Sequence, residues 1–135
     1  MEKKRKSVRG IITTSKGLVA IYRKKAILSD DKEVINYKEY YVLPGGGIEA
    51  HENKEDALKR EIKEELDIDI SVQKYLAFDV FSYEDITIKL SLYLCKISSG
   101  TIHDEEHSLL KWCTKEEMKD LDWSEADKKL LIYIL

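Results

Sequence analysis

The stretch from Leu43 to Ile68 constrains the fold more than any other part of the chain. It opens with the only proline, Pro44, and three consecutive glycines. Proline cannot donate to a sheet ladder, so the segment "YYVL" (Tyr40–Leu43) is expected to be a strand that stops there. Glycines adopt dihedrals that are closed to other residues and let a backbone approach another group closely. The stretch therefore predicts a strand, then a tight loop, then a helix.

The helix is predicted from its cap and its apolar spacing. Asn53 is expected to cap it, and Glu55 and Asp56 suit the positive end of the helix dipole in the first turn. Every fourth residue of the following segment is apolar, which gives the helix one stripe to bury: Leu58, Ile62 and Leu66.

Three carboxylates fall on the helix arc beside this stripe, at about 100° per residue: Glu61, Glu64 and Glu65. Like charges at these spacings destabilise a helix by about 0.2–0.5 kcal/mol per pair. Lys59 and Lys63 would relieve part of the repulsion, and alone the segment would be a solvated helix face. A divalent cation would relieve it better, because Mg²⁺ and Mn²⁺ prefer oxygen ligands. The three carboxylates stand at a fixed distance from the glycine loop, and such a loop can present its backbone amides to a phosphate group. The loop and the acids together therefore favour a metal site over a solvated helix face.

The same residues resemble the Nudix box, G-x5-E-x7-R-E-U-x-E-E-x-G-U, in which U is a bulky aliphatic residue. Gly46 and Glu52 stand at the first two fixed positions, and Arg60–Ile68 covers the rest. Asp67 departs from the family, which usually has glycine there, but aspartate tolerates a left-handed conformation at a helix end. His51 replaces a glycine that is common just before the first box glutamate.

On these residues the chain is identified as a member of the Nudix family. The resemblance extends to a predicted hairpin, Val8–Lys25, and to the stretch from Trp112 to Glu117. Further predicted strands are Lys74–Tyr83, Ile86–Ile97 and Leu109–Trp112, and two helices are expected after caps at Thr114 and Ser124. This order predicts an α/β (α+β) Nudix fold, a mixed β-sheet sandwiched between α-helices, in one domain of residues 1–135.

The resemblance also implies roles for the box residues. The carboxylates that it makes ligands of divalent metal, Mg²⁺ with Mn²⁺ as a substitute, are Glu61, Glu64 and Glu65. The carbonyl of Gly46 is expected to be a further ligand, and either Glu64 or Glu65 to help deprotonate the attacking water. Glu52 and Arg60 resemble a pair whose salt bridge fixes the loop against the helix.

Candidates outside the box carry alternatives. The acids of the loop "HDEEHSLLKW" could add a base or ligand, or could simply belong to a polar loop, which is the better interpretation for any single one of them; among them Glu106 is favoured over Asp104 and Glu105. Arg9 and Arg23 could contact substrate phosphates or could be solvated strand residues. Tyr83 lies 15 positions past the box, where a tyrosine resembles dinucleoside polyphosphate hydrolases; it could equally be an ordinary strand aromatic. The histidines lack metal-ligand spacing and are expected at the surface: His51, His103 and His107.

Composition narrows the class of protein. A net charge of −3 and a pI near 5.7 argue against a partner that is a nucleic-acid polymer. Nine Lys/Arg and no acid lie in residues 3–25, and the basic start is expected to be a solvated, partly frayed terminus or else an anion-collecting arm: Lys3, Lys4, Arg5 and Lys6. We expect neither a signal peptide nor a membrane partner. Cys95 and Cys113 lack metal-site spacing and suggest reduced thiols in a cytoplasmic protein.

The resemblance implies a metal-dependent hydrolase that cleaves the diphosphate linkage of a nucleoside diphosphate derivative, a nucleoside triphosphate or a related small nucleotide. The alternatives are a dinucleoside polyphosphate hydrolase, a non-catalytic nucleotide-sensing module on the same fold, and an isomerase, which would need additional catalytic residues. The absence of proline after Pro44 counts against the ADP-ribose group. The sequence leaves open a homodimer, the number of metal ions and which phosphorus is attacked.

Overall fold

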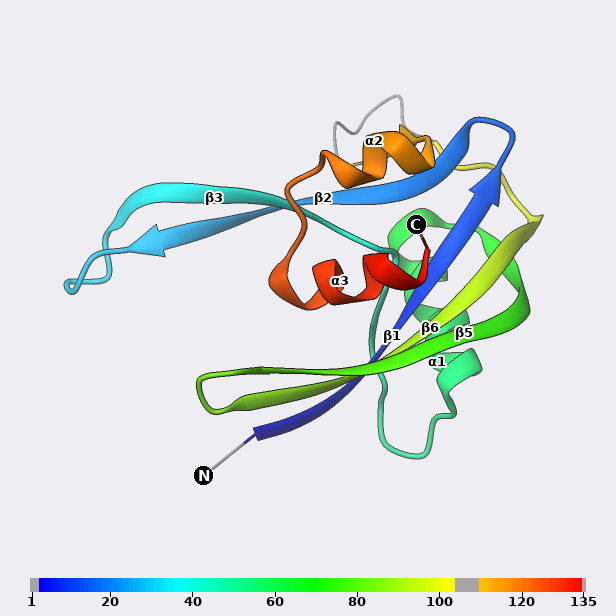
Figure 1. Cartoon of the computed structure of the whole chain (residues 1–135). Helices are drawn as coiled ribbons and strands as arrows, with labels where there is room; N and C mark the ends of the chain where they lie inside the picture. Colours follow the sequence, from blue (N-terminus) through cyan, green and yellow to red (C-terminus); the bar gives the residue numbers. More distant parts are fainter. Residues whose placement is uncertain (1–2, 104–109, 135) are drawn as a thin grey trace.

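The computed structural model describes residues 3–103 and 110–134 (Figure 1). Within them one sheet joins β1 (Lys3–Thr14), β2 (Gly17–Leu28), β3 (Val34–Val42), β4 (Gly45–Gly47), β5 (Asp69–Tyr83), β6 (Ile86–Ser99) and β7 (Leu110–Cys113). The helical segments are α1 (Lys54–Leu66), α2 (Lys115–Lys119), α3 (Glu125–Leu130) and the 3₁₀ turn η1 (Leu131–Tyr133). No helix among these residues is long and apolar enough to cross a membrane.

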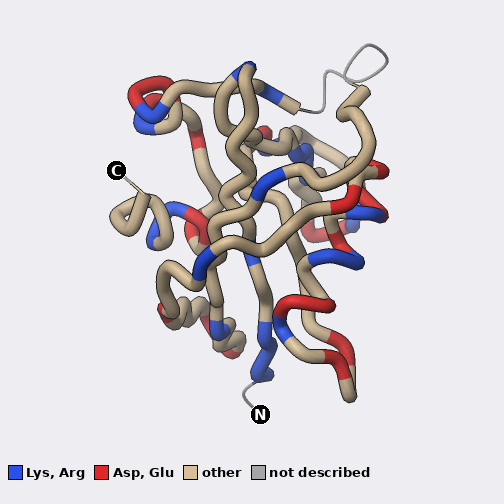
Figure 2. The backbone as a smooth tube through the Cα atoms, turned by 90° about the vertical axis from the view of Figure 1, so that its right-hand side faces the viewer, with Lys and Arg blue, Asp and Glu red and all other residues tan. Residues whose placement is uncertain are grey.

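The sheet is mixed, with the strand order β3-β2-β1-β6-β5, and β4 and β7 pair with β1 and β2. β1 runs parallel to β6, while the other pairs of strands are antiparallel. The expectation that the basic N-terminal residues are frayed is wrong. Lys3 pairs with Ile86 and Arg5 with Ile88, because β6 extends far enough to give the start of β1 a neighbour. Figure 2 shows this basic start beside the N-terminus, and its side chains are exposed to solvent.

The neighbouring strands β1 and β6, in the middle of the sheet, are covered on both faces. The predicted apolar face of β6 is present, and Leu90 and Leu92 pack there with Met118 and Leu130 from α2 and α3. The opposite face of β6 is buried too, since Cys95 packs in a second cluster with residues from α1 such as Leu58 and Ile62. Each fully buried side chain of this size stabilises the fold by roughly 1.5–3 kcal/mol. Helices therefore lie on both faces of the sheet (Figure 1), which confirms the predicted α+β sandwich.

Local sequence signals set the ends of α1. The side-chain oxygen of Asn53 accepts a hydrogen bond from the amide of Asp56 at 2.8 Å, as predicted for the N-cap. At the other end Asp67 has φ 53° and ψ 43°, the left-handed conformation expected of it, and its amide donates to the carbonyl of Lys63. These two residues fix the length of the helix, and hence where its carboxylates lie.

Candidate functional site

The glycine loop passes between β1 and α1 at a separation that side chains would prevent. β4 pairs antiparallel with Ser7–Arg9 of β1. Gly45 has a φ of 141°, and a Cβ there would overlap the carbonyl oxygen of Val8. A Cβ on Gly46 would instead overlap the carboxylate of Glu61. The loop thus brings an α1 carboxylate into direct contact with backbone.

A second α1 carboxylate, that of Glu65, contacts the same loop one turn further along the helix. Its Oε1 accepts a hydrogen bond from the amide of Gly45 at 3.0 Å, and its Oε2 accepts one from Arg23 of β2. The Glu65 side chain is 13% exposed. Burial raises the pKa of Glu65, while the Gly45 amide and the charges of Arg23 and Arg9 oppose that rise.

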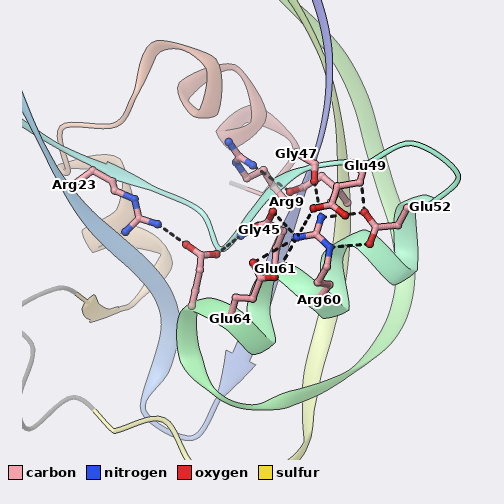
Figure 3. A network of polar contacts seen from close by, with 11 residues as sticks. Arg9, Arg23, Gly45, Gly47, Glu49, Glu52, Arg60, Glu61 and Glu64 are labelled. Carbon is pink, nitrogen blue, oxygen red and sulfur yellow. Dashed lines mark hydrogen bonds and ion pairs between the residues drawn. The ribbon is translucent and has the colours of Figure 1, made fainter.

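Arg60 connects α1 to Gly47 and to Glu52, which lie at the two ends of the segment between β4 and the helix (Figure 3). Its Nε and Nη2 donate to the two carboxylate oxygens of Glu52 at 2.8 and 2.9 Å, and Nη2 also donates to the carbonyl of Gly47 at 3.0 Å. A bidentate pair of this kind fixes orientation as well as distance. The Arg60 guanidinium lowers the pKa of Glu52 from 4.5 to about 2, helped by the backbone amide of Glu49. Reciprocally, the carboxylate of Glu52 raises the pKa of Arg60.

The same guanidinium also faces two acids of α1. Nη1 of Arg60 lies 3.0 Å from Oε1 of Glu61 and 3.4 Å from Oε2 of Glu64. The Glu64 side chain is 60% exposed, so one of the three candidate metal-binding carboxylates of α1 opens toward solvent. The carboxylates are therefore balanced by arginine: Glu61 and Glu64 by Arg60, and Glu65 by Arg23.

These residues suit a hard divalent cation. Among the described residues no three His, Cys, Asp or Glu side chains converge on one point. The donors nevertheless are all oxygen, as Mg²⁺ and Mn²⁺ prefer, and Glu61 and Glu65 both lie against the Gly45–Gly46 backbone. The space that a Cβ on Gly46 would fill is taken by the Glu61 carboxylate, so this carboxylate lies directly against the loop at Gly46.

A buried ion pair ties the C-terminal segment to the start of the loop. Asp127 of α3 is fully buried and accepts hydrogen bonds from Nε of Arg9 at 3.3 Å and from the amide of Leu43 at 2.6 Å. The interpretation of Arg9 as a solvated strand residue is therefore wrong, because its side chain is only 16% exposed. Figure 3 shows the Arg9 side chain running from β1 toward α3. Sequence reasoning missed Asp127, which looked like an ordinary acid in the first turn of a helix.

A cavity of about 380 Å³ opens beside Glu65 and Arg23. Its described lining also includes Asp67 and His103 and a set of apolar side chains from β2, α1, β7 and the segment after β6: Ile21, Leu66, Ile102 and Leu110. The apolar walls next to charged groups make this cavity suitable for a planar, mostly apolar group attached to an anion.

Other sequence candidates do not join this cluster. Tyr83 ends β5, is 61% exposed and stacks on Phe81. The cleft that it lines contains no residue of the box. His51 and His103 are exposed, as expected. Four further candidates lie outside the described residues: Asp104, Glu105, Glu106 and His107.

Comparison with known proteins agrees with this geometry. The family model of the NUDIX domain matches residues 3–133. The chain is 34% identical over 87 residues to a CTP pyrophosphohydrolase of Escherichia coli, covering 64% of each protein. It is 33% identical over 89 residues to a putative 8-oxo-dGTP diphosphatase 2 of Mycobacterium tuberculosis, covering 64% of this chain and 62% of that one. It thus spans slightly less than two thirds of the length of these relatives.

Solved structures show the same arrangement over nearly the whole chain. The solution structure of the E. coli ORF135 protein superposes with a TM-score of 0.76 at 27% identity, covering 98% of this chain and 89% of that one. A MutT protein from Staphylococcus aureus superposes with a TM-score of 0.65 at 25% identity, covering 98% of each chain. The chain belongs to the Nudix family.

Proposed function

We propose that the protein hydrolyses the diphosphate linkage of a nucleoside triphosphate or a related nucleotide, with a divalent metal ion. The observation that carries this proposal is the contact of two α1 carboxylates with one glycine loop, Glu61 against Gly46 and Glu65 on the Gly45 amide. The names of the relatives support the substrate class, because they describe proteins that act on CTP, on 8-oxo-dGTP and on nucleoside triphosphates.

The proposed metal ligands are the three helix carboxylates and one loop carbonyl: Glu61, Glu64, Glu65 and that of Gly46. A bound Mg²⁺ or Mn²⁺ would neutralise charge on the phosphate oxygens of the substrate. Arg60 would then keep its bidentate bond to Glu52 and so hold the loop and the helix in register. Either Glu64 or Glu65 would accept a proton from the attacking water.

Arg23 is proposed to contact the substrate. It is half-exposed, bonds to Glu65 and borders the cavity. A guanidinium there can exchange its carboxylate partner for a phosphate oxygen, which is bound in the same bidentate geometry. Arg9 is held by Asp127. We therefore propose that its positive charge acts on the site from a distance and that it makes no direct contact with the substrate. The apolar walls of the cavity would receive the base.

A substrate panel tests the reaction. The purified chain is incubated with CTP, dCTP, 8-oxo-dGTP, dGTP, a dinucleoside polyphosphate and a sugar nucleotide, each with Mg²⁺ or Mn²⁺, and the products are identified. We expect a nucleoside monophosphate and pyrophosphate from a triphosphate, and hydrolysis in ¹⁸O water shows which phosphorus is attacked. Tight nucleotide binding by calorimetry without turnover under either metal would instead indicate the sensing module.

The carboxylate variants test the site. Glu61→Gln, Glu64→Gln and Glu65→Gln keep the side-chain shape and remove the charge. Because general acid–base or charge-stabilising groups typically contribute about 10²–10⁴-fold, we expect losses of that order in kcat/KM. Glu55→Gln, in the first turn of the same helix, is the matched control and keeps its activity. Wild-type rates in all three variants would remove these residues from the site.

We also propose that the protein is located in the cytoplasm. Cys95 and Cys113 are both free and buried, which fits the reducing cytoplasm.

A further inference from the structure

The outer parts of β2 and β3 form a two-stranded arm, residues 24–39, that projects beyond the helices (Figure 1). Its apolar side chains are exposed to an unusual degree: 52% for Leu28, 52% for Val34, 65% for Ile35 and 50% for Tyr37. An isolated two-stranded hairpin is marginally stable in water. The arm thus carries apolar side chains of the kind that a protein usually buries, but no other described element packs over them.

The free edge of the arm belongs to β3, which ends the strand order of the sheet. At the inner end of β3, the amide of Tyr41 donates to the carbonyl of Asp122 and its carbonyl accepts from Ser124. Beyond that point, within the described part of the chain, no strand pairs with the outer edge of β3. An exposed apolar edge of this kind is a template for pairing with another chain.

The base of the arm is positively charged. Lys25 and Lys38 stand directly opposite each other across β2 and β3. Like charges in that position destabilise a sheet, and no ion pair between described residues includes either lysine. Both lysines line a cleft of about 600 Å³ that also contains Tyr40, Phe81, Tyr83 and one acid, Glu125, so its described cations outnumber its acids. The cleft is suited to an occupant that is both acidic and apolar.

The tip of the arm is acidic. The turn between the two strands carries Asp30, Asp31 and Glu33 around a single lysine, Lys32. At its base the arm carries three lysines and one acid, Glu39 opposite Lys24. From base to tip it is thus cationic in net charge, then apolar, then anionic. If two copies lie antiparallel, the tip of each reaches the base of the other and the apolar middles face one another. A two-fold axis satisfies both ends at once, as in other isologous interfaces.

We propose that the β2–β3 arm is a self-association surface, on which two copies of this chain pack antiparallel with each acidic tip in the other's Lys25–Lys38 cleft. The partner copy pairs along the free edge of β3 and so lies beside both faces of the arm: it neutralises Lys25 and Lys38 on one face and adjoins Tyr37, which packs with Lys24, on the other. The dimer leaves the α1 carboxylates and the cavity beside Glu65 outside the interface, so it does not depend on the proposed hydrolysis.

The solution mass tests the association. Light scattering after size exclusion is expected to give twice the 15.7 kDa of one chain, falling toward one chain on dilution. Ile35→Glu places a charge in the apolar middle and is expected to give a monomer. The matched control is Ile132→Glu, at a residue of η1 that is 70% exposed and lies outside the arm; it stays dimeric. Far-UV circular dichroism confirms that each variant is folded.

Charge reversal tests the pairing of base with tip. Lys25→Glu with Lys38→Glu, or Asp30→Lys, Asp31→Lys and Glu33→Lys together, are each expected to give monomers. The combination of all five restores the dimer, because the complementary pattern is rebuilt with the opposite sign. A monomeric wild type at every concentration overturns the proposal, and so does a dimer that ignores Ile35→Glu. So does a nucleotide that binds the cleft and is lost with the two lysines while the mass stays that of one chain.

Discussion

At the scale of single residues, Gly46 and Gly47 offer a matched test of the loop. A Cβ on Gly46 would overlap the Glu61 carboxylate, whereas nothing lies within 4 Å of a Cβ on Gly47. We expect Gly46→Ala to displace that carboxylate, weaken Mn²⁺ binding and lower kcat/KM about 10²-fold, while Gly47→Ala stays close to wild type. Calorimetric Mn²⁺ titration and the hydrolysis assay measure the two effects. Equal behaviour of the two variants would contradict the assignment.

The Glu52–Arg60 pair predicts a pH dependence of stability. The pKa of Glu52 falls from 4.5 to about 2 in the folded chain, so its ionisation stabilises the fold above pH 4.5, and this stabilisation is lost as the pH falls toward 2. The difference in unfolding free energy between wild type and Glu52→Gln is therefore expected to be constant near neutrality and to shrink between about pH 4.5 and 2. Urea denaturation across that range measures it.

Glu49→Gln is the control for this titration, because Glu49 lies 3.7 Å from Arg60 and its side chain is 70% exposed. It is expected to show little pH-dependent difference from wild type, since exposed ion pairs contribute little. A Glu52→Gln difference that is unchanged at low pH would show that the pair does not set the pKa of Glu52.

At the scale of elements, α3 is attached to the centre of the fold through Asp127. This carboxylate is 1% exposed and bonds to Arg9 of β1 and to the amide of Leu43 before the glycine loop. Breaking a buried pair by removing one partner costs roughly 3 kcal/mol, so Asp127→Ala is expected to lower the free energy of unfolding by about that amount. Glu125→Ala, at an exposed position of the same helix, should change it little. Denaturant titration of both variants decides the point.

The elements that local spacing defines could be predicted from the sequence. The α1 cap at Asn53, the left-handed Asp67 and the apolar stripe depend on neighbours within a turn or two, and all three are present. Arg60 and Glu52 are separated by 8 residues, so their approach also follows from one loop and one helix. Contacts between distant elements could not be predicted. Arg9 and Asp127 are separated by 118 residues, and no local sequence pattern shows that β1 and α3 bring them together.

The same limit applies to strand order. The alternation in β6 shows that it is a strand with one apolar face, but alternation does not identify its neighbours. The parallel pairing with β1 places β6 inside the sheet, and the other face of β6 is also buried, where Ser91 lies. It also orders the basic N-terminal residues, whose composition alone indicated a frayed end. The position of the cavity beside Glu65 depends on β7 and the segment after β6, which the box does not describe.

At the scale of the whole molecule, β1 and β6 belong to both cores. Val8 and Ile12 of β1 pack toward α1, while Ile11 packs toward α2 and α3. The loss of either core therefore removes packing from the same two strands. The prediction that the chain is one domain therefore becomes a prediction that both cores unfold in one cooperative transition.

Two tryptophans report on the two cores separately. Trp112 packs against the α1-side core, and Trp123 is buried in the other. In Trp123→Phe and Trp112→Phe backgrounds, the fluorescence transitions in urea are expected to coincide with that from circular dichroism. Ile62→Ala on one side and Leu92→Ala on the other should each lower the free energy of unfolding by about 2–5 kcal/mol in both backgrounds, because a cavity on either face weakens the shared strands. A variant that shifts only the tryptophan on its own side would show that the two cores unfold independently.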